Sequence, residues 1–101
     1  MNYQKVILVG NATKDAKRQT SKKGDVSFTT FTLAVGVDRD SVTYFPVVAF
    51  GKLGEVTAKY VIQGSQALVE GRIQLSENGH LSIIADKVVF GARPRAVEKA
   101  E

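Results

Sequence analysis

The residues with the clearest potential for chemistry lie in one segment, Thr43 to Lys52. Tyr44, Val48 and Phe50 are residue types that suit a β-strand. Because side chains alternate along a strand, Tyr44 and Phe50 lie on one face, roughly 20 Å apart. Lys52 lies two residues beyond Phe50. Two aromatic rings with a cation beyond them suit the stacking of flat ligands, whereas packing in the core is the plainer interpretation of the same pattern.

Composition excludes several classes of function. The chain has 101 residues and 44% apolar side chains, which fits a single globular domain. It has no cysteine and one histidine, so we expect no disulfide, no metal site, no cofactor and no Cys/His nucleophile. The carboxylates Glu55, Glu70 and Asp86 are isolated on different elements, so we expect no enzymatic activity. No segment resembles a membrane span or a signal peptide, so we expect a cytoplasmic protein.

The net charge of +4 is concentrated in the segment from Lys14 to Lys23. This segment holds five basic residues against one acidic residue: Lys14, Lys17, Arg18, Lys22 and Lys23 against Asp15. We expect a long, mobile loop between strands. Such a loop can attract a polyanion, although a merely solvated loop has the same composition.

The first strand is apolar on both faces. Val6 to Val9 is a continuous run of branched apolar side chains, whereas a strand with one solvent-exposed face alternates apolar and polar side chains. A second subunit could bury the face of this strand that does not pack against the core, so we expect self-association through this strand.

A long β-rich segment runs from Val26 to Val37. Phe31, Leu33 and Val35 share one face, but Phe28 has the opposite parity. We therefore expect a bulge or a sharp bend between them. The polar residues 38–41 should form a short hairpin connection into the strand that carries Tyr44.

A helix and a second hairpin follow. Helical spacing from Leu53 to Val61 predicts an amphipathic helix with Leu53, Val56, Tyr60 and Val61 on its apolar stripe, and Gly64 is a candidate left-handed cap. Strands at 66–75 and 81–90 are joined at Asn78-Gly79. A three-residue loop would pair Leu75 with Leu81 and Ile73 with Ile83, a register that matches apolar with apolar side chains.

The order of elements predicts an all-β fold. Five strands with one helix between the third and fourth is the order of the OB-fold, a partly open barrel. We expect this domain to span residues 1–91. The polar residues 92–101, with Pro94, Arg93 and Arg95, should form a fraying tail.

Several segments resemble the bacterial single-stranded DNA-binding protein family. Together they cover about residues 3 to 91, in the order and spacing of that family. They are Lys5–Asn11 (KVILVGN), Phe31–Ala34 (FTLA), Phe50–Leu53 (FGKL), Ala58–Tyr60 (AKY), Gly64–Gln66 (GSQ), Val69–Arg72 (VEGR) and Ala85–Phe90 (ADKVVF).

The resemblance implies a homo-oligomer, commonly a tetramer built from dimers, that wraps single-stranded DNA without sequence preference. Such proteins serve DNA replication, recombination and repair, at the nucleoid. In the family pattern, stacking aromatics fall at Tyr44 and Phe50, and a phosphate-binding lysine falls at Lys52. The further basic residues that we consider candidate phosphate contacts are Lys5, Lys14, Lys22, Lys23, Arg72 and Lys87.

The sequence departs from the family pattern in three ways. It contains no tryptophan, and its last hairpin is minimal where the family has a long basic arm. It ends at Glu101 without the flexible tail and acidic tip by which family members recruit other proteins, so we do not expect recruitment by that route. Two alternatives stay open: an accessory primosomal OB-fold protein of replication restart, and an OB module that binds another protein.

Overall fold

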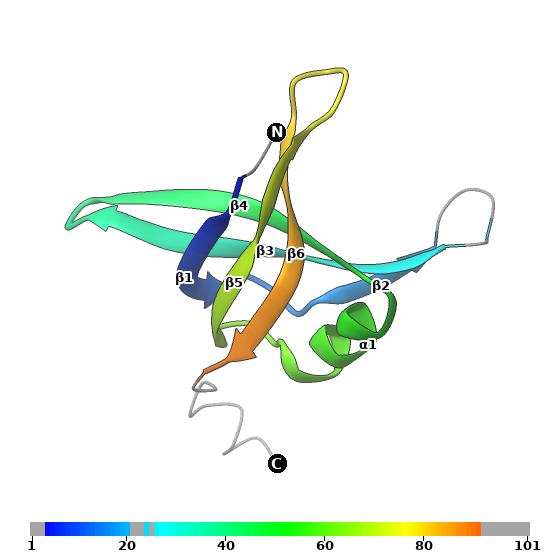
Figure 1. The fold of residues 1–101 in the computed structure, drawn as a ribbon. Helices are drawn as coiled ribbons and strands as arrows, with labels where there is room; N and C mark the ends of the chain where they lie inside the picture. Colours follow the sequence, from blue (N-terminus) through cyan, green and yellow to red (C-terminus); the bar gives the residue numbers. More distant parts are fainter. Residues whose placement is uncertain (1–3, 21–23, 25, 92–101) are drawn as a thin grey trace, which may run out of the picture.

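The structure, a computed structural model, describes residues 4–20, 24 and 26–91, and strands make up most of them. The elements, in chain order, are β1 (Val6–Ala12), β2 (Lys17–Thr20), β3 (Ser27–Asp38), β4 (Ser41–Phe50), α1 (Gly51–Tyr60), β5 (Gln66–Leu75) and β6 (Leu81–Phe90). Figure 1 shows β1, β5 and β6 crossing the long β3–β4 hairpin, with α1 below one end of β4.

Five of the strands close into a barrel. The neighbours run β1–β5–β6–β4–β3, and β3 pairs back to β1 through Ala34 opposite Asn11 and Leu33 opposite Ala12. Only β4 and β6 are parallel among these pairs. The single helix lies between the third and fourth barrel strands, so the predicted OB-fold is confirmed. Residues 92–101, which we expected to form a tail, lie outside the described residues.

The basic segment is more ordered than predicted. We expected a loop, but Lys17–Thr20 forms β2 and pairs antiparallel with the first four residues of β3. The loop prediction was wrong because all four residues of β2 are polar, so the sequence shows no strand-like alternation of polar and apolar side chains there. A long β3 nevertheless offers an edge of backbone donors and acceptors that a second strand can satisfy. Lys22 and Lys23 lie outside the described residues.

The alternation along β3 is regular where we expected an interruption. Thr29, Phe31 and Leu33 are buried, whereas Phe28 belongs to the outer face. The inner position next to α1 is taken by Thr29, whose hydroxyl donates to the Gly54 carbonyl at 2.6 Å. The predicted bulge between Phe28 and Phe31 is therefore wrong, because Phe28 is not a core residue. The irregularity lies instead between Gly36 and Asp38, at the far end of the strand.

The β5–β6 hairpin has the predicted register. Leu75 lies opposite Leu81 and Ile73 opposite Ile83, with Gly79 in the left-handed region at φ 82°. Gly64 is also left-handed, at φ 86°, but it lies in the turn that leads into β5. It does not cap the helix, because α1 already ends at Tyr60.

The core lies inside the barrel and is closed at one end by α1. Leu33, Val47 and Ile83 are fully buried at its centre. The predicted stripe is confirmed in part, since Val61 is buried and Leu53 packs against the core, whereas Tyr60 is exposed. The residues buried within α1 itself are small, Gly54 and Thr57. A Cβ at Gly54 would come within 2.5 Å of the Ala49 carbonyl oxygen, so the helix packs too closely for a larger side chain. No helix in the described part of the chain is long and apolar enough to span a membrane.

Candidate nucleic-acid interface

The strand β4 presents the aromatic side chains that the sequence singled out. Val47 and Ala49 point into the core, and the alternate residues Tyr44 and Phe50 lie on the outer face, as the alternation predicts. Tyr44 is 61% exposed and Phe50 is 46% exposed. Core packing within this chain is therefore excluded for both rings.

A third aromatic ring joins this face and was missed as a candidate. Phe28 of β3 lies directly opposite Phe50, and the ring centroids are 5.9 Å apart with the planes inclined at 51°. Its parity, opposite to that of Phe31, was the signal that it points outward. We call Phe28, Tyr44 and Phe50 the aromatic face.

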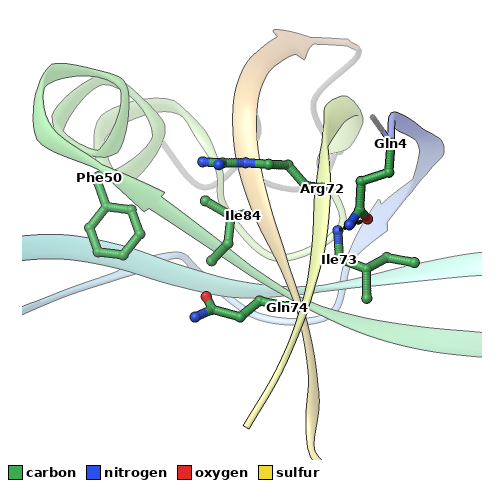
Figure 2. A pocket seen from close by; sticks show the side chains of 6 residues that line it. All are labelled: Gln4, Phe50, Arg72, Ile73, Gln74 and Ile84. Carbon is green, nitrogen blue, oxygen red and sulfur yellow. Dashed lines mark hydrogen bonds between the residues drawn. The ribbon is translucent and has the colours of Figure 1, made fainter. Parts of the chain in front are cut away.

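Phe50 also forms one wall of a pocket beside β5 and β6 (Figure 2). Arg72 lines the same pocket, with its guanidinium drawn above Ile84 and Ile84 drawn beside the Phe50 ring. At the other end, Gln4 accepts a hydrogen bond from the Ile73 backbone N–H at 2.9 Å. The pocket therefore combines an aromatic ring, an aliphatic floor and a cation.

The guanidinium of Arg72 is held only weakly. Its Nη2 is 3.7 Å from an Asp86 carboxylate oxygen, and both side chains are more than half exposed to solvent. An exposed ion pair of this kind contributes about 0–1 kcal/mol. Arg72 can therefore exchange Asp86 for another anion at little cost in stability.

The other candidate cations are spread over the surface. Lys52 is exposed in the first turn of α1, directly after the aromatic face, and Lys14 is exposed between β1 and β2. Lys5 forms an ion pair with Glu70 of β5, and Lys87 lies opposite Glu70 on β6. The structure thus brings Phe50 and Arg72 together, but not Lys5, Lys14 or Lys87.

The Lys5–Glu70 pair changes the acidity of the glutamate. The hydrogen bond from Lys5 is the main cause that holds the pKa of Glu70 below its ordinary value, against an opposing contribution from desolvation. The charges of Lys5 and Lys87 act in the same direction as the hydrogen bond. Lys5 therefore already has an anionic partner within the chain.

A second apolar surface lies on the outside of β1, β5 and β6. Val9 is the cross-strand partner of Leu68, which in turn lies opposite Val89. Ile7 and Val9 are 59% and 49% exposed. We call Ile7, Val9, Leu68 and Val89 the apolar patch. In the described residues, the β1 positions from Val6 to Gly10 pair only with β5, so their other edge is open.

These features are typical of one class of protein, the OB-folds that bind nucleic acids. A closed five-stranded barrel with exposed aromatic rings and cations on its outer surface is the arrangement by which OB-folds bind single-stranded nucleic acids. No group of three potential metal ligands occurs in the described ranges.

Comparison with known proteins gives the family. The model of the single-strand binding protein family matches residues 3–90, so the chain belongs to that family. A single-stranded DNA-binding protein from Clostridium perfringens is 36% identical over 72 residues, which cover 69% of this chain and 48% of that protein. One from Clostridium tetani is 35% identical over 99 residues, which cover 85% of this chain and 68% of that protein.

A solved structure agrees with the fold. The wild-type single-stranded DNA binding protein from Thermus aquaticus superimposes with a TM-score of 0.76 over 91% of this chain and 42% of that chain, at 24% identity. The chain spans about half the length of the first of these relatives.

Proposed function

We propose that this protein binds single-stranded DNA without sequence preference and protects it during replication, recombination and repair at the nucleoid. The observation that carries the proposal is the exposure of Tyr44 and Phe50 on one face of β4. A protein that needed these rings for its own core would bury them. Relatives that are named for single-stranded DNA binding favour this function over a purely protein-binding OB module.

Binding combines two physical effects. Basic side chains neutralise phosphates and release the counterions condensed on the strand, which attracts any sequence equally. Bases then stack on Tyr44 and Phe50, and every base offers a π-face, so no sequence is read. Lys52, two residues after Phe50, and Arg72, which lines the same pocket as Phe50, are the first phosphate contacts. The remaining candidates are Lys5, Lys14, Lys22, Lys23 and Lys87.

The protein acts as a homo-oligomer, a dimer or a tetramer, assembled through β1. Two features support this part of the proposal. The apolar patch exposes branched aliphatic side chains on neighbouring strands. The edge of β1 that pairs with no strand in the described part of the chain offers backbone groups for a further strand.

The test is a filter-binding titration with oligo-dT and with a duplex of equal length, each at two salt concentrations. We expect tight binding to the single strand only, with log K falling against log salt at a slope of about −0.7 per phosphate contact. Equal affinity for the duplex, or affinity that does not change with salt, would contradict the proposal.

A further inference from the structure

A row of cross-strand partners connects two cations across five strands. Lys17 lies opposite Thr30, Thr30 opposite Val48, and Ile84 opposite Arg72. Val48 of β4 and Ile84 of β6 are parallel partners, and this pair joins the Lys17 end of the row to the Arg72 end. Direct cross-strand partners point to the same face of a sheet, so Lys17 and Arg72 both lie on the outer face. Four strand spacings separate them, roughly 19 Å.

The aromatic rings lie beside this row. Gln19 of β2 is opposite Phe28, and Phe28 is opposite Phe50. The Gln19 amide donates to the Thr30 hydroxyl at 2.9 Å, which ties β2 to the outer face of β3. Phe28 is thus flanked on one side by Phe50 and on the other by the polar side chains of β2.

We propose that Phe28 and Lys17 form a second nucleotide subsite, which rests on the proposed binding of single-stranded DNA. The base next to the one on Phe50 stacks on Phe28, and Lys17 neutralises its phosphate. The bound strand then crosses the barrel surface from Arg72 over Phe50 and Phe28 to β2. In this arrangement β2 is part of the binding surface and not only a cover for the edge of β3.

The next residue of β2 provides a matched control. Arg18 lies opposite Thr29, whose side chain points inward to α1, and the Arg18 guanidinium is 4.0 Å from the Glu55 carboxylate. Lys17 forms no ion pair within residues 4–20, 24 and 26–91. Lys17 and Arg18 therefore carry the same charge on the same strand but on opposite faces.

The first experiment compares Lys17→Gln with Arg18→Gln in salt titrations of oligo-dT binding. Lys17→Gln should reduce the slope of log K against log salt by about 0.7, the value for one phosphate contact on a single strand. Arg18→Gln should leave the slope unchanged. Equal changes of slope in the two variants would overturn the subsite, because only the overall positive charge of the protein would then matter. An unchanged slope in Lys17→Gln would overturn it as well, because Lys17 would then make no phosphate contact.

The second experiment compares Phe28→Leu with Phe28→Tyr. Leucine keeps apolar bulk but loses the ring, so Phe28→Leu should weaken oligo-dT binding about five-fold or more, while Phe28→Tyr should bind like the parent. Thermal melting establishes that both variants fold. If Phe28→Leu binds like the parent while Tyr44→Ala still loses affinity, the subsite is wrong and the proposed function stands. If the parent itself does not bind oligo-dT, the proposed function is wrong.

Discussion

The aromatic face and the apolar patch both expose large apolar side chains on the outside of one barrel, but they differ in shape and in charge. Phe28 and Phe50 are flat rings with Lys17 on the adjacent β2, Lys52 in the helix that follows β4, and Arg72 in the pocket that Phe50 lines. The apolar patch consists of branched aliphatic side chains, and the adjacent Lys5 is neutralised by Glu70. Flat rings among cations suit bases and phosphates, whereas aliphatic surface among paired charges suits burial against protein.

The largest expected effect tests the apolar patch. Val9→Glu would bury a charge in each copy of the proposed interface, which costs several kcal/mol unless the charge is paired. We expect the dissociation constant for self-association to rise about 100-fold or more, as measured by light scattering at micromolar concentrations. Single-stranded DNA binding by each barrel should persist.

Val37→Glu is the matched control for this prediction. Val37 is 65% exposed near the tip of the β3–β4 hairpin, outside the apolar patch. Its replacement should leave the assembly intact. A parent protein that is monomeric at these concentrations, or a Val37→Glu variant that dissociates as readily as Val9→Glu, would remove the role of the patch.

An intermediate effect separates the two faces of β4. Tyr44→Ala should cost about 1–3 kcal/mol in binding to oligo-dT, because one stacking ring is lost, and should leave stability nearly unchanged. Phe45→Ala, one residue along, should instead cost about 3 kcal/mol in folding stability, since Phe45 packs against the core. Binding isotherms and melting curves measure the two costs.

Tyrosine fluorescence gives a direct signal for the same prediction. The chain has three tyrosines and no tryptophan, so stacking on Tyr44 should quench emission when oligo-dT is added. Tyr3 and Tyr60 contribute background, and the quench must therefore be lost in Tyr44→Ala. A Tyr44→Ala variant that melts far lower than the parent yet binds normally while folded would show that β4 has been interpreted with its faces reversed.

The smallest expected effect concerns the ion pair beside the apolar patch. Because Lys5 lowers the pKa of Glu70 in the folded protein, the ionised carboxylate stabilises the fold at pH values above its ordinary pKa of 4.5. This contribution is lost as the pH falls through the lowered pKa. The melting temperature of the parent should therefore exceed that of Glu70→Gln at neutral pH, and the difference should shrink below about pH 4.5.

Glu55→Gln is the control for this pH dependence. Its carboxylate is 4.0 Å from Arg18 and its side chain is 62% exposed, so the ion pair is longer and better solvated. Removing it should change the melting temperature less than Glu70→Gln does. A difference between parent and Glu70→Gln that stays constant from neutral to acid pH would show that the ion pair does not contribute.

The local features of the fold follow from the order of the amino acids alone. Alternation placed Tyr44 and Phe50 together on one face, and turn chemistry at Gly79 determined the register of the last hairpin, including Leu75 opposite Leu81. The order of the elements was sufficient for the OB-fold. These features depend on neighbours in the chain, so a period of two residues or a single left-handed glycine encodes them.

The exposed face of each strand and the contacts between distant residues depend on how the whole barrel assembles. Alternation defines two faces of β3 but does not say that Thr29, and not Phe28, points inward beneath α1. The pairing of Phe28 with Phe50, the shared pocket of Phe50 and Arg72, and the existence of β2 all depend on strands that are far apart in sequence. The physical reason is that a strand satisfies its backbone hydrogen bonds with a partner chosen by the whole barrel, and no local pattern specifies that partner.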